Sequence, residues 1–127
     1  MTAEASVKYV ILIYHNPTAW DALSDAQRIE IGRRHLALAD NLAASGELIV
    51  SEALADPSLT RRVSVPEGRT MASDGPFAEV KEYLAGFYLI ECESIDQATG
   101  YAAQLPQGAY YEVEVRPVMD LKALLEL

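Results

Sequence analysis

The sequence predicts one α+β domain, and three observations support that prediction. The chain has 127 residues, close to the usual size of a single domain and long enough to bury a hydrophobic core. Half of the residues are apolar and 23% are charged, which is typical of a globular protein. Segments of strand type alternate with segments of helical period, and no repeat, low-complexity tract or linker separates them. We therefore expect a single domain over residues 1–127.

The first expected element is a strand over residues 7–14, which are mostly β-branched and aromatic. Its two alternating sides are both apolar: Tyr9, Ile11 and Ile13 on one, Val10, Leu12 and Tyr14 on the other. A strand with two apolar faces must be covered on both. The Asn-Pro-Thr sequence at residues 16–18 should end this strand.

A long helix is expected from about Asp25 to Ser45. Residues 24–27, Ser-Asp-Ala-Gln, have the form of a capping box, and Gly46 suits the left-handed position that follows a helix. Four residues spaced i, i+4, i+7 and i+11 form one stripe that should face the core: Ile31, His35, Leu38 and Leu42.

The middle of the chain predicts a second strand over residues 47–54 and a hairpin between Arg61 and Ser73. The turn at residues 65–68, Val-Pro-Glu-Gly, has its Pro and Gly where a type I turn favours them. A buried strand should then cover residues 86–91.

The last third predicts a helix, a strand and a short helix. A second capping box at residues 94–97 opens the helix. Its apolar stripe consists of Ile95, Ala98, Ala102 and Leu105. A half-exposed strand should cover residues 111–116, and a short helix residues 120–125. The order β-α-β, inserted hairpin, β-α-β is the ferredoxin-like arrangement, an antiparallel sheet with both helices on one face.

The other face of this sheet should need a partner. Two helices cover one face, while the strands at residues 7–14 and 86–91 are apolar on the other as well. An open apolar face on a globular protein usually marks an interaction site. The economical partner is a second copy packed with two-fold symmetry, so we expect a homodimer.

Charge and cysteine content argue against several classes of partner and site. The chain has 10 Lys and Arg against 19 Asp and Glu, a formal charge of −9, which disfavours nucleic acid and membrane surfaces as partners. The single cysteine, Cys92, allows no intrachain disulfide, and the two histidines have no metal-ligand spacing. No phosphate loop or nucleophile elbow is present. We expect no metal and no cofactor, and a cytoplasmic location, since the apolar run at residues 7–14 is too short to span a bilayer.

The chain resembles the YCII-related proteins of the DGPF subgroup. The resemblance rests on residues 70–82, T-M-A-S-D-G-P-F-A-E-V-K-E, followed by residues 84–90, L-A-G-F-Y-L-I. It implies a dimeric α+β barrel of ferredoxin-like protomers. The biochemical role of this family is mostly unassigned. Some members are encoded beside extracytoplasmic-function sigma factors, which implies regulation as an alternative to catalysis.

His35 is the main candidate for chemistry. A half-buried imidazole can carry out proton transfer near neutral pH, although the same position also suits a core-edge histidine bonded to a backbone carbonyl. The resemblance implies a histidine here paired with an Asp after the second helix, but this chain has Leu105 at that position. Asp74 is the alternative catalytic partner, and its structural alternative is a turn residue that accepts a local hydrogen bond. Pro76 should bias Gly75 toward extended geometry, which would make this segment a rigid corner.

Three further residues are expected beside a ligand: Tyr14, His15 and Phe77. His15 ends the first strand, a common position for ligand contacts, and Phe77 would dock the corner onto the core. The leading hypothesis is a small-molecule-binding protein whose chemistry would be cofactor-free proton transfer or isomerisation. The alternative is a non-catalytic interaction or regulatory protein linked to a sigma factor. The sequence leaves open whether any reaction follows binding.

Overall fold

A computed structural model describes residues 7–75, 82–106 and 111–126. Its main sheet has four strands in the order β2-β5-β1-β6, and every neighbouring pair is antiparallel. The strands are β1 (Val7–His15), β2 (Leu48–Ala53), β5 (Tyr83–Cys92) and β6 (Tyr111–Pro117). A separate two-stranded sheet is formed by β3 (Arg61–Ser64) and β4 (Met71–Asp74). The predicted α+β class is therefore confirmed.

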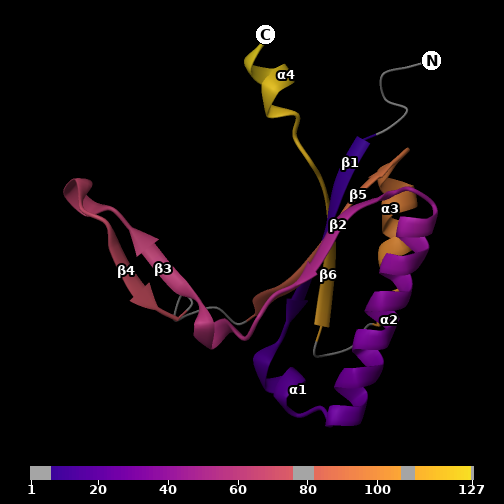
Figure 1. Ribbon diagram of the computed structural model, residues 1–127, viewed down its shortest axis with the longest axis horizontal. Helices are drawn as coiled ribbons and strands as arrows, with labels where there is room; N and C mark the ends of the chain where they lie inside the picture. Colours follow the sequence, from indigo (N-terminus) through magenta and orange to yellow (C-terminus); the bar gives the residue numbers. More distant parts are fainter. Residues whose placement is uncertain (1–6, 76–81, 107–110, 127) are drawn as a thin grey trace.

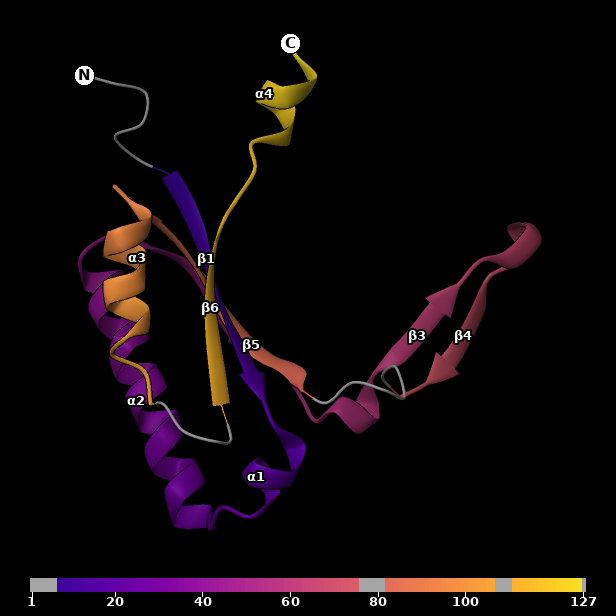
Figure 2. The ribbon, with the colours of Figure 1, turned by 180° about the vertical axis from the view of Figure 1, so that it is seen from behind.

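Two helices, α2 (Asp25–Ala44) and α3 (Ile95–Ala102), lie together on one side of the main sheet (Figure 1). The β3–β4 hairpin extends away on the opposite side, and the reverse view shows the same separation (Figure 2). Two short helices complete the fold: α1 (Pro17–Asp21) after β1, and α4 (Leu121–Leu125) near the C-terminus. Two 3-10 turns lie at η2 (Pro57–Leu59) and η3 (Pro66–Gly68). None of the helices in the described ranges is both long enough and apolar enough to cross a bilayer.

The start of α2 follows from its capping box. The Gln27 backbone N–H donates to Ser24 Oγ at 3.1 Å, and the Ser24 N–H donates to Gln27 Oε1 at 2.8 Å. After the helix, Gly46 has φ +82°, a conformation that glycine adopts without strain. Both predicted ends of this helix are confirmed.

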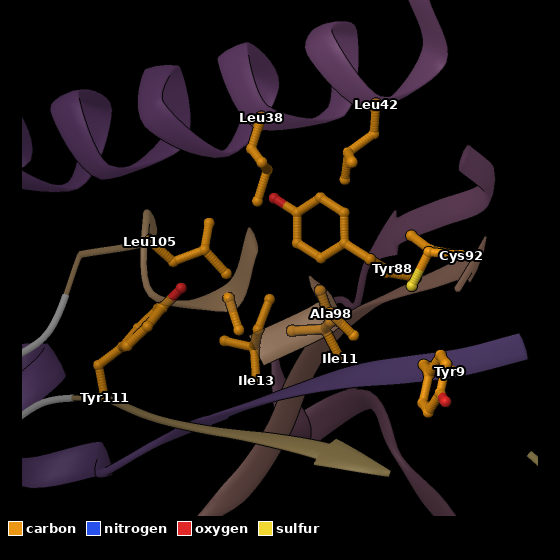
Figure 3. Close-up of a cluster of buried hydrophobic side chains, with 12 residues drawn as sticks. Tyr9, Ile11, Ile13, Leu38, Leu42, Tyr88, Cys92, Ala98, Leu105 and Tyr111 are labelled. Atoms are coloured by element: carbon orange, nitrogen blue, oxygen red, sulfur yellow. The ribbon is translucent and has the colours of Figure 1, made fainter. Parts of the chain in front are cut away.

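The core lies between the sheet and the two helices (Figure 3). The stripe of α2 contributes Leu38 and Leu42, which lie over Tyr88 in this view. Side chains that alternate along β1 and β5 complete the core from below, because successive residues of a strand face opposite sides. The predicted stripe of α3 is buried at Ala98 and Ala102 and exposed at Ile95, which is 43% exposed. Leu105 is buried as well, but it lies beyond the end of the helix.

The segment at residues 16–18, which ends β1, also begins a helix. Asn16 Oδ1 accepts a hydrogen bond from the Ala19 N–H at 3.0 Å, and Pro17 occupies the first helical turn of α1. Proline at that position costs no hydrogen bond, so the residues that end β1 begin α1. The prediction of a simple break missed this helix.

The predicted hairpin is confirmed, but its turn lies one residue further along the chain. The Arg69 N–H donates to the Pro66 carbonyl at 3.0 Å, so Glu67 and Gly68 are the central residues. Both have positive φ, +51° and +79°, which is the pattern of a type I′ turn and not of the expected type I turn. Type I′ geometry matches the twist of paired strands, and this preference outweighs the fit of Pro66 to a type I turn.

Candidate functional site

A cavity of about 800 Å³ lies between the first half of α2 and the adjoining parts of β2 and β5. Its size falls within the range of small-molecule sites. Ile13, Leu36 and Ala39 contribute apolar wall, and both histidines of the chain, His15 and His35, line it. A few polar groups within an apolar wall are typical of sites that bind and orient organic molecules.

His35 is hydrogen-bonded at both ring nitrogens to tyrosines of the sheet. Its Nδ1 lies 2.7 Å from the hydroxyl of Tyr88 on β5. Its Nε2 lies 2.9 Å from the hydroxyl of Tyr111 on β6. Tyr88 also donates to the His35 backbone carbonyl at 3.1 Å. These bonds tie the middle of α2 to two strands that do not neighbour each other in the sheet.

The contacts of the network support an assignment of the His35 tautomer. A tyrosine hydroxyl has one proton, and we assign that of Tyr88 to the His35 carbonyl, a group that can only accept. With that assignment, the contact at Nδ1 is an imidazole N–H that donates to the Tyr88 oxygen. Neutral imidazole has one N–H, so Nε2 accepts from the Tyr111 hydroxyl. We assign His35 as the neutral Nδ1–H form.

Burial keeps this network uncharged. Desolvation, and after it the charge of Arg34, lowers the pKa of His35 below its usual value of 6.5. Desolvation also raises the pKa of the Tyr88 hydroxyl well above its usual value. Both groups are therefore neutral at pH 7, as the assigned tautomer requires.

His15 lies in a row of aromatic residues across three strands. At the end of β1 it pairs with Tyr83 on β5 and with Tyr111 on β6. Its ring stacks on Trp20 of α1 with centroids 3.9 Å apart and meets Tyr83 edge-on at 5.6 Å. Desolvation, with a smaller contribution from His35, lowers the pKa of His15 to about 4.

Arg28 holds Trp20 in this row. Its Nη2 donates to the backbone carbonyls of Trp20 and Asp21, both at 3.1 Å. The guanidinium carbon lies 5.7 Å from the centroid of the Trp20 ring, within the range of a cation–π contact. The end of α1 is thereby tied to the first turn of α2.

The structure does not bring Asp74 to His35. Asp74 ends β4, its side chain is 95% exposed, and its Oδ1 lies 3.9 Å from Arg61 Nε. The hairpin that carries it extends away from the side of the sheet that α2 covers (Figure 1). The expected His35–Asp74 pairing is wrong in geometry, because both ring nitrogens of His35 are bonded to tyrosines.

The expected geometry of the Asp-Gly-Pro-Phe segment is also corrected. Gly75 has φ +83°, a left-handed value and not the extended one expected before a proline. Its N–H donates to the Thr60 carbonyl at 2.6 Å, and this bond to the start of the hairpin sets the local direction of the chain. Phe77 lies outside the described residues.

The other expected residues occupy different places. His15 lines the cavity. Tyr14 lies on the opposite face of the sheet from Ile13, where desolvation and Glu114 raise its pKa. Leu105, at the position where the resemblance implies an acid, is buried in the core with 2% exposure.

Sequence reasoning missed the tyrosines that bond to His35. Tyr88 and Tyr111 are 3% and 2% exposed, and a buried tyrosine hydroxyl needs a polar partner. The histidine in the otherwise apolar stripe of α2 was that partner. The sequence therefore showed one polar side chain in each of three apolar segments: His35, Tyr88 and Tyr111. It did not show that these three side chains meet.

The sequence pattern of the YCII-related domain family matches residues 7–122. The chain belongs to the YCII-related domain family. An uncharacterised protein of Rhizobium meliloti (strain 1021) is 33% identical to this YCII-related chain over 115 residues, which cover 87% of this chain and 90% of that protein. The match includes the whole cavity wall, from Ile13 to Tyr88.

Proposed function

We propose that this YCII-related protein binds a small organic molecule in the cavity between α2 and the β2–β5 edge. The observation that carries the proposal is the Tyr88–His35–Tyr111 network beside that cavity. Such a network fixes polar groups in one orientation within an apolar wall, which is how small-molecule sites obtain specificity. Its neutral state favours hydrogen bonding to the ligand over ion pairing.

If the site also catalyses a reaction, we propose cofactor-free acid/base chemistry at His35. Neutral imidazole is in the protonation state of a general base. Because both nitrogens are bonded to tyrosines, a proton would reach His35 through a tyrosine hydroxyl. In the assigned tautomer the basic nitrogen is Nε2, so the tyrosine that would pass that proton is Tyr111.

Filling the cavity tests the binding proposal. Gly32 on α2 lines the cavity, and a Cβ added there meets no atom within 4 Å. Gly32→Phe should therefore leave the fold intact and weaken binding of small aromatic fragments such as phenol, benzamide and indole by at least about tenfold. Fragment binding is measured by ligand-observed NMR.

Gly100→Phe is the matched control, because Gly100 on α3 is equally open and does not line the cavity. It should leave fragment binding unchanged. Equal binding to the Gly32→Phe and Gly100→Phe variants would place the site elsewhere.

We also infer a ferredoxin-like protomer of the DGPF subgroup that forms a cytoplasmic homodimer through the open face of its sheet. The strand order β2-β5-β1-β6 and the Asp-Gly-Pro-Phe segment support the first part. The paired, half-buried side chains on the open face support the second: Val10 beside Leu89, and Leu12 beside Phe87. The hairpin extends on the same side, where it would meet a second copy (Figure 2). The free, buried thiol of Cys92 is in keeping with a reducing compartment.

Leu12→Glu should convert the dimer into a monomer. An unpaired carboxylate buried between two sheets costs several kcal/mol, so the dimer should weaken by about a hundredfold or more. Sedimentation equilibrium measures the change, with Ile95→Glu on the helical side as control. A monomeric wild-type protein at micromolar concentration would contradict the dimer.

A further inference from the structure

The two histidines that line the cavity differ in what their ring nitrogens contact. Both nitrogens of His35 form short hydrogen bonds, at 2.7 and 2.9 Å. His15 Nδ1 lies 3.5 Å from the Tyr83 hydroxyl, longer than an ordinary hydrogen bond. Within residues 7–75, 82–106 and 111–126, no hydrogen bond reaches His15 Nε2. His15 is therefore the imidazole with a nitrogen available to a bound molecule.

Aromatic packing fixes the position of the His15 ring. Trp20 stacks on one face at 3.9 Å, and Tyr83 and Tyr111 lie beside it with centroids at 5.6 and 5.7 Å. Such contacts hold the ring in place without using its nitrogens. The site is thus built to present a nitrogen in a fixed position.

We propose that His15 is the imidazole that contacts the bound molecule and that its Nε2 forms a hydrogen bond with an uncharged hydroxyl or carbonyl group. This inference rests on the proposed binding function of the cavity. It assigns the two histidines different roles: His15 touches the ligand, and His35 positions the tyrosines and α2 behind it.

The charges around His15 favour an uncharged ligand group. A pKa of about 4 leaves the ring neutral at pH 7, so it offers no positive charge to a carboxylate. Arg28, which lies over the Trp20 ring, donates to the carbonyls of Trp20 and Asp21 and lies 3.7 Å from Asp25 Oδ1. Arg33 also lines the cavity, but its side chain is 73% exposed and weakly paired with Glu30 at 4.0 Å. Glu52 and Asp56 line the same cavity and oppose an anion.

Side-chain NMR of the wild-type protein with phenol and with benzoate tests the proposal. The two probes are flat rings of similar size, one uncharged with a hydroxyl and the other an anion. Long-range ¹H–¹⁵N spectra resolve the two imidazoles, since the chain has only two histidines. We expect phenol to shift the His15 Nε2 resonance and leave the His35 nitrogens nearly unchanged. Benzoate should bind at least about tenfold more weakly.

A variant and its control test whether the nitrogens of His15, and not only its flat ring, contribute to binding. His15→Phe keeps a stacking ring beside Trp20 and removes both nitrogens, so phenol should bind about fivefold more weakly, the loss of one neutral hydrogen bond. Tyr101→Phe on α3, a tyrosine that does not line the cavity, is the control and should leave phenol binding unchanged.

The outcomes distinguish this inference from the function on which it rests. If phenol shifts the His35 nitrogens and the amides around the cavity but not His15, the cavity binds ligands and the role of His15 is overturned. Tighter binding of benzoate than of phenol would overturn the inference that the ligand group at His15 is uncharged. If no probe shifts His15, His35 or the cavity amides, the proposed function and this inference both fall.

Discussion

Tyr88→Phe should lower the free energy of unfolding by about 2 kcal/mol, because a buried hydroxyl with two partners is lost. Tyr88 is 3% exposed, and its hydroxyl accepts from His35 Nδ1–H and donates to the His35 carbonyl. The carbonyl keeps its place in the helix, but the imidazole N–H loses its acceptor. Urea unfolding followed by circular dichroism measures the change.

Tyr83→Phe is the matched control for this loss. It makes the same chemical change on the same strand, but the contact of the Tyr83 hydroxyl within the described residues is a long one, 3.5 Å to His15 Nδ1. The free energy of unfolding should change by less than about 0.5 kcal/mol. Equal losses in the two variants would show that the hydroxyl of Tyr88 does not hold α2 through His35.

Gly86→Ala should destabilise the protein by about 1–3 kcal/mol, because it forces two strands apart. A Cβ at residue 86 would lie 2.9 Å from the Glu52 carbonyl oxygen of β2, closer than such atoms approach. The neighbouring atom belongs to the backbone and cannot rotate away. Gly86 and Glu52 both line the cavity, so ligand binding should fall together with stability.

Gly100→Ala gives the opposite expectation with the same substitution. Gly100 lies inside α3, and a Cβ there meets nothing within 4 Å. Alanine should raise the free energy of unfolding by about 0.5–1 kcal/mol through helix propensity alone. If Gly86→Ala proves as harmless as Gly100→Ala, the close approach of β2 and β5 at residue 86 is not a real constraint.

Much of the fold could be predicted because its signals are local. The capping box at residues 24–27 and Gly46 set the two ends of α2, and the spacing of Ile31, Leu38 and Leu42 set its buried face. The turn of the hairpin was less predictable. Pro66 suggests a type I turn, while the twist of the two strands favours a type I′ turn, which places Glu67 at positive φ.

The site could be predicted only in part, because its contacts join distant segments. His35 and His15 were identified from their places on a helix stripe and at a strand end. The partners of His35 lie 53 and 76 residues away in the chain, a separation that no local pattern encodes. The carboxylate of Asp74 suits a catalytic partner chemically, but the direction of the hairpin carries it away from His35.

The state of the two imidazoles tests the central claim most directly. A long-range ¹H–¹⁵N spectrum at pH 7, followed through an acid titration, reports the tautomer and the pKa of each ring. The assigned network predicts that His35 is neutral, with its proton on Nδ1 and a pKa below 6.5. Burial of His15 predicts that its ring titrates near pH 4. A proton on Nε2 of His35, or a His35 pKa at or above 6.5, would contradict the assigned network.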